Sequence, residues 1–172
     1  LIGYGSLQGA QHSLLKNPGL FVVNDGKLSK DDLNHLFRIA ESNKINTEDK
    51  IGHFGLGMKS VFHICEAFFM FFNQPENADE LNRNTNFLDP WFDDDDTPEI
   101  RLKWNQEFND HYSELYNLVK GYVNPWVQGW KRWFCVWIPL RTREMLDSSC
   151  PPISETIPDR NAIEELLSIR KA

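Results

Sequence analysis

Two short motifs hold residues whose types and spacing could recognise a phosphorylated ligand. The first motif, Asn24-Asp25-Gly26, directly follows the apolar residues 19–23. The second is the run Gly52-His53-Phe54-Gly55-Leu56-Gly57, which Met58-Lys59-Ser60 extend. Either motif alone is weak evidence, because Asn-Asp-Gly is a common turn and glycine clusters are frequent in loops.

Together the two motifs could bind the two ends of a nucleotide. Glycines let the backbone approach a ligand closely, and a helix that begins near Gly57 would offer unpaired N–H groups and a positive dipole end to phosphates. Asn24, at the end of a strand, could accept a hydrogen bond from the exocyclic amine of a purine. Lys44 and Lys59 could add positive charge beside the phosphates.

The glycine spacing excludes two common nucleotide-binding motifs. The pattern G-x-x-x-x-G-K-[ST] is absent, although Met58-Lys59-Ser60 resembles its end, and the pattern G-x-G-x-x-G is not met. The polar residues 41–52 separate the two motifs and include Ser42 and Lys44. We expect them to form a mobile loop that lies over the ligand as a lid.

The hydrophobic pattern predicts the elements that position these motifs. Residues 19–23 and 67–72 are short apolar runs typical of buried strands. Ser29 is placed to cap a helix with one apolar face, made of Leu33, Leu36, Phe37 and Ala40. The same spacing predicts a second helix from near Gly57, with an apolar face of Met58, Val61, Phe62 and Cys65.

The second half of the chain predicts a helix, a strand and a final helix. Helical spacing over Phe108, Tyr112, Leu115 and Val119 indicates a helix that ends at Gly121. Strict alternation over Phe134, Val136, Ile138 and Leu140 favours a strand at about 133–140, with Pro139 at a sheet edge or a strand end. The C-terminal helix is expected at about 159–171.

Four tryptophans, at positions 126, 130, 133 and 137, lie close to this strand. We expect Trp126 and Trp130 to pack against the core from the preceding segment. The alternative is a stacking platform for single-stranded nucleic acid.

Composition limits the class of protein. The chain has 172 residues, 41% of them hydrophobic and 13% aromatic, which is incompatible with a disordered chain, a collagen-like repeat or a disulfide scaffold. The net charge is -7. Non-specific binding of nucleic acid is therefore not indicated, because it requires a positively charged surface. Nine acids and one arginine between Asn73 and Glu99 give that segment a charge of −8, which leaves about +1 for the rest. We expect this acidic segment to be a solvated, mobile loop.

The cysteines and the apolar runs favour a cytoplasmic protein. Three cysteines without a C-x-x-C pair are typical of a reduced chain. The longest apolar run, residues 67–72, is far shorter than the ~20 residues of a membrane span, and no signal peptide is visible. The five histidines show no zinc-like pairing with cysteines, and we predict no metal ligand in the chain itself.

The order of strand, Asn-Asp-Gly, helix, polar lid and the run from Ile51 to Val61 resembles a known family. It is similar to the ATP-binding domain shared by gyrase B subunits, ninety-kilodalton heat-shock chaperones, MutL-type repair proteins and histidine kinases. Within that superfamily it resembles most the sacsin-like and chaperone-like branch. Glu41-Ser42-Asn43-Lys44 is similar to the start of that branch's lid, and Ile138-Pro139-Leu140-Arg141 to the end of its later core strand.

The resemblance implies a fold and a domain organisation. The fold would be α+β, a two-layer α/β sandwich with a mixed, mostly antiparallel sheet (the Bergerat-type ATP-binding fold) and an acidic insertion. Residues 1–172 would form one partial ATP-binding domain with core motifs at 20–72 and 133–141. The insertion would span about 73–130.

The resemblance also implies ligand contacts. The implied nucleotide-binding residues are Asn24, Asp25, Gly26, Ser42, Lys44, Gly52, His53, Phe54, Gly55, Leu56, Gly57, Met58, Lys59 and Ser60. Asn24 stands where the family usually has the Asp that bonds the adenine amine, and Asp25 is the neighbouring candidate if the register slips by one. Gly26 would let adenine approach, and the glycines of the second motif would cradle the phosphates. The implied cofactors are ATP and Mg²⁺.

The residues that precede the first motif, Asn24-Asp25-Gly26, contain no counterpart of the family's catalytic glutamate. The family carries its catalytic Glu and its magnesium-binding Asn on a helix before the first motif, whereas residues 1–19 contain no Glu. Leu1 is not a Met, so we expect that helix to belong to a longer chain, with ATP hydrolysis possible only there. The partners expected are a nucleotide, other domains of that parent chain and a possible homodimer, with no membrane.

The leading hypothesis is therefore an ATP-binding module of a larger chaperone-like or sacsin-like ATPase. The alternative is a degenerate, non-hydrolysing domain that serves as a protein-interaction scaffold. Asn24 in place of Asp, and Lys27-Leu28 where the family has a second glycine, favour that alternative.

Overall fold

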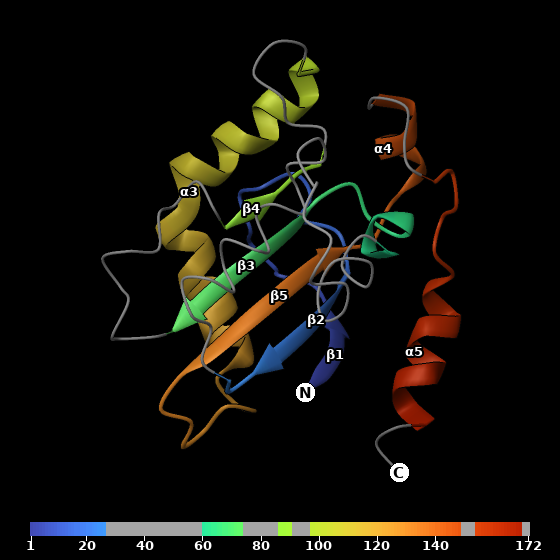
Figure 1. Cartoon of the computed structure of the whole chain (residues 1–172). Coiled ribbons are helices and arrows are strands. Elements are labelled where there is room, and N and C mark those ends of the chain that lie inside the picture. The colour runs from blue at the N-terminus through green and yellow to red at the C-terminus, as the bar shows by residue number, and fades with distance from the viewer. Residues whose placement is uncertain (27–59, 74–85, 91–96, 149–153, 170–172) are drawn as a thin grey trace, which may run out of the picture.

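A five-stranded sheet forms the centre of the molecule (Figure 1). The computed structural model describes residues 1–26, 60–73, 86–90, 97–148 and 154–169. The strands are β1 (Ile2–Gly5), β2 (Gly19–Asn24), β3 (Phe68–Asn73), β4 (Phe87–Leu88) and β5 (Trp133–Pro139). They lie in the order β1-β2-β5-β3-β4, and every pairing within the described part of the chain is antiparallel.

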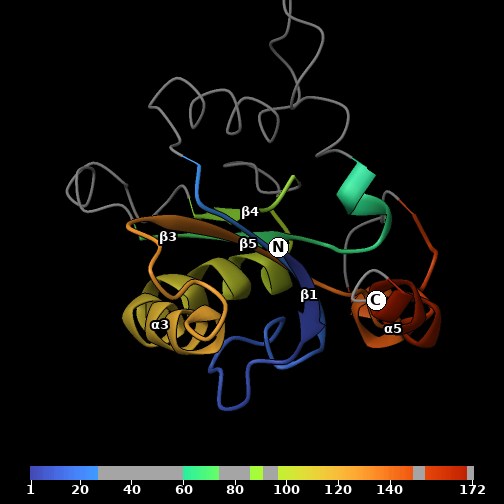
Figure 2. The ribbon, with the colours of Figure 1, turned by 90° about the horizontal axis from the view of Figure 1, so that it is seen from below.

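One long helix covers one face of the sheet, as Figure 2 shows. This helix is α3 (Glu99–Val123), and two shorter helices, α4 (Arg143–Ser148) and α5 (Arg160–Ile169), lie beyond β1 on the other side of the molecule (Figure 1). A single 3-10 turn, η1 (Val61–His63), precedes β3. The arrangement is an α+β domain with one helix packed on an antiparallel sheet.

Side-chain alternation divides the sheet into two apolar faces. On β2, Phe21 and Val23 belong to the cluster under α3, whereas Leu20 packs with the cluster on the opposite face. All six residues of β3 except Asn73 are buried. This continuous burial explains why β3 is a run of aromatic residues and Met without polar alternation, because central strands covered on both faces need apolar residues throughout.

A single row of paired residues crosses all five strands on the α3 side. In the order of the strands from β1 to β4, the residues of this row are Gly3, Phe21, Trp137, Phe69 and Phe87, and each pairs with the next. The Phe21 and Trp137 rings stack with centroids 5.4 Å apart. Gly3 is required here, because a Cβ at that position would lie 2.3 Å from the Phe21 ring.

Helix α3 seals this aromatic row. Its buried apolar residues recur at helical spacing: Trp104, Phe108, Leu115, Val119 and Val123. Tyr122 meets both Phe21 and Trp137 edge-on, at 5.4 and 5.3 Å between ring centroids. Such edge-to-face pairs add about 0.5–1.5 kcal/mol each beyond the area they bury. The face of the sheet under α3 is therefore a packed aromatic core.

Several sequence predictions are confirmed. Strands occur at 19–24, 68–73 and 133–139, and a C-terminal helix occurs at 160–169. Trp133 and Trp137 are core residues, and Trp126 packs on Phe21, although 44% of it stays exposed.

Pro139 ends β5, which confirms the second of its two predicted positions, a strand end. A mixed, mostly antiparallel sheet was expected, and every pairing among the described residues is antiparallel. The extent of the second predicted helix is wrong. Val61 and Phe62 lie in a 3-10 turn, and Cys65 lies beyond its end, so the predicted helical face does not extend to Cys65.

The segment predicted to be a solvated acidic loop contains buried structure. Asp89 is 7% exposed and pairs with an arginine, and α3 begins at Glu99, well before the first helical residue expected at Phe108. The helix also continues past Gly121 to Val123. Asp93–Asp96, like the helix expected after Ser29, lie outside the described residues.

The segment between β1 and β2 docks on α3 through a buried histidine. The side chain of His12 is fully buried, and its Nε2 lies 2.9 Å from the Trp104 carbonyl oxygen. Its Nδ1 accepts a hydrogen bond from the Leu14 N–H at 3.1 Å. These two partners define a neutral ring with its proton on Nε2. Next to it, the Ser13 N–H and hydroxyl both donate to the Glu107 carboxylate.

Burial lowers the pKa of His12 to about 4, and it outweighs the nearby Glu107 carboxylate and the Trp104 carbonyl, both of which raise that pKa. The unfolded chain therefore takes up a proton near pH 6.5, while the folded chain does not do so until about pH 4. The folded state loses stability as the pH falls through this window.

We expect the free energy of unfolding to fall by up to about 3 kcal/mol between pH 7 and pH 4 because of His12 alone. Chemical denaturation at several pH values would measure it in the original chain and in His12→Gln. The variant should lose most of this pH dependence above pH 4.5, whereas His111→Gln, at a half-exposed site on α3, should keep it. Equal pH profiles for the original chain and His12→Gln would contradict the assignment.

Candidate functional site

The candidate site lies on the sheet face opposite α3. A second apolar cluster occupies this face, with Phe62, Cys65, Phe68, Met70, Phe72, Leu88, Val136 and Ile138 as its buried members. Alternation along β2 places Asn24 on the same face as Leu20, since they are four residues apart. The register confirms this, because Asn24 pairs with Phe134, which packs against the second cluster.

The first motif forms a tight turn at the end of β2. The Asn24 side-chain oxygen accepts a hydrogen bond from the Gly26 N–H at 2.7 Å. This Asx turn bends the chain away from the strand and leaves Asn24 and Asp25 exposed. A Cβ built on Gly26 would lie 3.0 Å from the Asn24 side-chain oxygen, so among the described residues this side chain is the close neighbour of the turn.

Ser60, the last residue of the second motif, lies at the other end of the sheet. It precedes η1, and the Ile64 carbonyl just after that turn accepts a hydrogen bond from the Arg141 N–H. Arg141 follows the Pro139 end of β5, which pairs with Gly19. The ends of β2 are about 17 Å apart, at ~3.3 Å per residue. Asn24 and Ser60 therefore lie toward opposite ends of β2, as Figure 1 shows for the end of β2 and the teal turn that follows Ser60.

The remaining predicted contacts lie outside the described residues. These are Ser42, Lys44, Gly52, His53, Phe54, Gly55, Leu56, Gly57, Met58 and Lys59. Of the predicted site, the structure thus describes Asn24, Asp25, Gly26 and Ser60, and it places them on or beside one face at opposite ends of β2.

A buried cluster of charged residues, which the sequence did not predict, holds the segment that follows Ser60. Glu66 is 3% exposed, and its two carboxylate oxygens accept hydrogen bonds from two different arginines. Oε1 accepts from Arg141 Nε at 2.5 Å, and Oε2 accepts from Arg101 Nη2 at 2.7 Å. Arg101 Nη1 also binds Asp89 Oδ1. Two positive and two negative side chains therefore balance one another in the interior.

Arg141 uses all five of its N–H donors. Besides Glu66, its guanidinium donates to the backbone carbonyls of Phe62, His63 and Cys65, at 2.6 to 2.8 Å, and to that of Thr156, at 3.1 Å. The first three carbonyls belong to η1 and the residues just after it. Arg141 therefore ties the end of the second motif's segment to β5 and to the chain that leads into α5.

This cluster explains how the residues after the second motif keep their place. A short 3-10 turn has few hydrogen bonds of its own, so its free carbonyls need other donors, and Arg141 supplies them. The sequence indicated one part of this arrangement, the end of a strand at Ile138-Pro139-Leu140-Arg141. It did not indicate that Arg141 would lie in one cluster with Glu66, Asp89 and Arg101. Contacts between residues 35 to 75 positions apart do not follow from local spacing.

Neither described cysteine has the environment of a nucleophile. Cys65 and Cys135 are fully buried, and burial raises the pKa of both thiols far above the ordinary value. Within the described ranges, no group of three or more His, Cys, Asp and Glu side chains could hold a metal ion. No helix of the described part is long and apolar enough to cross a membrane.

A shallow groove of about 650 Å³ lies on the other side of the molecule. It runs between the end of β1 and the C-terminal half of α3, and its lining includes Ser6, Gln8, Asn117 and Tyr122. These side chains are neutral, and the groove is separated from the candidate site by the sheet itself. It therefore contributes nothing to the two motifs.

The comparison with protein families places the chain in a class. The family model described as "Sacsin domain" matches residues 5–172, nearly the whole chain, and the chain therefore belongs to the Sacsin domain family. No solved structure matches the chain.

The chain is also similar to a short part of one curated protein. The chain is similar to the human protein named "Sacsin", with 30% identity over 90 residues. These residues make up 52% of this chain but only 2% of the length of the human protein. The similarity thus concerns one small part of a very long protein.

The buried charged cluster makes a testable prediction for stability. Arg141→Met should lower the free energy of unfolding by about 3–5 kcal/mol, because it leaves the Glu66 carboxylate short of a partner and four carbonyls without donors. Arg141→Lys keeps the charge but loses the planar fork, so it should recover only part of the loss. Chemical denaturation would measure both.

Arg143 provides a matched control, because it is exposed and lies two residues further along. Arg143→Met should change the free energy of unfolding by no more than about 0.5 kcal/mol. If Arg141→Met and Arg143→Met proved equally stable, the buried cluster would have no structural role.

Proposed function

We propose that this chain is the ATP-binding module of a larger sacsin-like protein. Three observations support the proposal. The chain belongs to the Sacsin domain family, it spans a small part of the long relative that it resembles, and the first of its two nucleotide-type motifs lies on a sheet face away from α3. The position of Asn24, exposed at the end of β2 with its side-chain oxygen at the turn, carries the most weight.

In this proposal ATP lies along the sheet face opposite α3. Adenine would lie at the Asn24 turn, where the side-chain oxygen of Asn24 can accept a hydrogen bond from the exocyclic amine while it keeps its bond to the Gly26 N–H. The glycines at 52, 55 and 57 would bring backbone N–H groups to the phosphates. Mg²⁺ would arrive as the complex with ATP, since this ion binds mainly through phosphate oxygens and water.

The chain's own residues would bind and orient the nucleotide rather than cleave it. Residues 1–19 contain no glutamate that could act as a general base beside the first motif. Hydrolysis, and any closure of a lid over the nucleotide, is therefore proposed for the longer protein, where other segments supply the missing groups.

A titration with a fluorescent ATP analogue and Mg²⁺ tests the proposal. We expect Gly55→Val combined with Gly57→Val to weaken binding at least tenfold, because the added side chains would block the approach of the backbone to the phosphates. Asn24→Leu should weaken it by roughly tenfold, the value of one hydrogen bond, and Asn24→Asp should retain it.

Gly121→Ala serves as the control, because a Cβ there meets nothing within 4 Å and the position lies on α3, away from the site. This variant should bind the analogue as the original chain does. The proposal fails if the original chain shows no binding at millimolar concentrations, or if the paired glycine variant binds as tightly as the original chain.

A further inference from the structure

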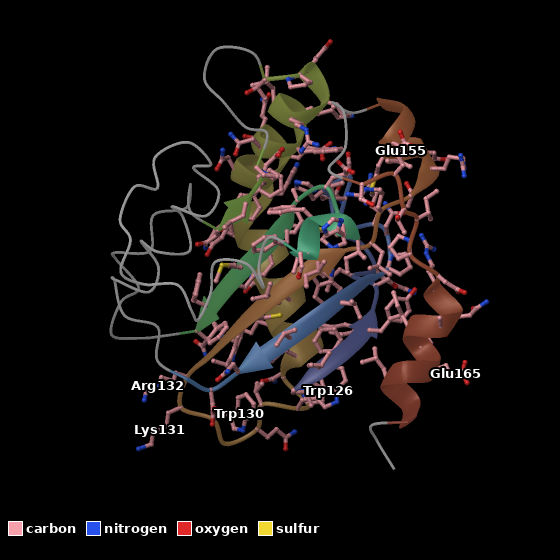
Figure 3. The ribbon with its side chains drawn as sticks, turned by 45° about the vertical axis from the view of Figure 1, so that its right-hand side comes forward. Trp126, Trp130, Lys131, Arg132, Glu155 and Glu165 are labelled. Carbon is pink, nitrogen blue, oxygen red and sulfur yellow. The ribbon has the colours of Figure 1, made fainter. Side chains whose placement is uncertain are left out.

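A small surface of exposed tryptophan and positive charge lies at the C-terminal end of α3. We call it the Trp126 surface and define it by Trp126, Trp130 and Lys131, in the loop between α3 and β5. Figure 3 shows these residues together with Arg132 at one end of the sheet, with Lys131 pointing away from the body. Residues 124–132 contain Lys131 and Arg132 and no acid, in a chain of net charge -7.

Trp126 is held as a rigid, half-open ring. One side of it packs against Phe21 and Tyr122, each at 5.4 Å between ring centroids, and 44% of the residue remains exposed. Few other large apolar side chains in the described part of the chain are as exposed. A large aromatic side chain that is fixed from behind loses little conformational entropy when it binds a partner.

The loop itself is preorganised. Hydrogen bonds run from the Trp126, Val127 and Trp130 N–H groups back to carbonyls three residues earlier. Val127 is buried in the core at 5% exposure, and Gly129 adopts the positive φ of 83° that the turn requires. The backbone that carries Trp126, Trp130 and Lys131 is therefore held in one conformation.

The chain contains a segment with the complementary chemistry. Residues 89–98 read Asp-Pro-Trp-Phe-Asp-Asp-Asp-Asp-Thr-Pro, so they combine four consecutive acids with two aromatic residues and two prolines. The acids match Lys131, and the apolar residues suit an exposed indole face.

This segment cannot reach the Trp126 surface of its own molecule. It ends where α3 begins, and the surface lies where α3 ends, about 37 Å further along a helix of 25 residues. Residues 91–96, attached at Thr97, can extend no more than about 21 Å from it. Any pairing between them must therefore join two molecules.

We propose that the Trp126 surface is a docking site for the acidic residues 90–98 of a second copy of this chain, since Asp89 itself is held by Arg101 in the interior. The contact is heterologous, since two different surfaces meet, so one copy can bind a second at one end and a third at the other. This inference does not depend on nucleotide binding.

Fluorescence anisotropy of a labelled peptide with the sequence of residues 90–98 tests the docking site. We expect the peptide to bind the full chain with an affinity that falls at least fivefold between 50 and 300 mM NaCl, because the charges are exposed. Trp126→Ala and Lys131→Glu should each weaken binding at least fivefold. Leu102→Ala, at an exposed site near the start of α3, should leave it unchanged. A peptide with Asn in place of Asp93–Asp96 should not bind.

Sedimentation velocity of the full chain tests the second copy as the occupant. We expect self-association that Lys131→Glu abolishes and that Asp94→Lys combined with Lys131→Glu restores. Lys131→Glu changes one exposed side chain, so its fold is expected to stay intact even if Trp126→Ala loosens the contact with Phe21.

Four results would overturn the proposal, three of them from the two experiments above. These are the absence of peptide binding at millimolar concentration, peptide binding that neither variant weakens, and a chain that stays monomeric at several hundred micromolar. An oligothymidine that bound the same residues more tightly than the peptide would also overturn it, in favour of a nucleic-acid surface.

Discussion

The buried carboxylate of Glu66, held between Arg101 and Arg141, is the contact on which the rest of the molecule depends. It joins segments that are far apart in the sequence: the turn after Ser60, the start of α3, the end of β4 through Asp89, and the end of β5. Burying four charges is costly, and their mutual attraction offsets that cost only when all partners are in place. The geometry of one part therefore constrains the others, and the position of η1 follows from the positions of α3 and β5.

The two faces of the sheet differ in what the described residues place beside them. Under α3, the row from Gly3 to Phe87 is sealed by aromatic side chains and by the docking of His12 on Trp104. On the opposite face, the described residues of the two motifs lie at the two ends of β2. Asn24 lies in an exposed Asx turn, and Ser60 lies beside the turn η1, whose carbonyls accept hydrogen bonds from Arg141. Apolar clusters on both faces fix the strands, and a rigid sheet of this kind holds the residues at its strand ends in defined positions.

The sequence predicted what depends on local periodicity and missed what depends on distant pairing. The alternation of 133–140 and the apolar runs at 19–23 and 67–72 located the central strands, because burial on a pleated surface requires those patterns. The start of α3 was hidden because Arg101 lies on the buried face of the helix, where an apolar residue is expected, although Thr97-Pro98-Glu99 is a recognisable helix start. The ion cluster and the burial of His12 could not be foreseen, since both depend on residues brought together only by the fold. Asn24 was predicted at a strand end and is found there, while the second motif is described only at Ser60.

Charged residues are distributed unevenly along the chain. The acidic residues between 73 and 99 come before α3 in the sequence and the basic loop 124–132 comes after it, and the start of the acidic segment lies beside that loop because Asn73 pairs with Trp133. Asp89, the one described acid of that segment before α3, is held in the core by Arg101, so this acid has a structural role. Because the screening length at physiological salt is about 8 Å, exposed charges further apart than this interact only weakly. The net charge of -7 is the sum of an acidic segment of −8 and a remainder of about +1, so it describes neither part.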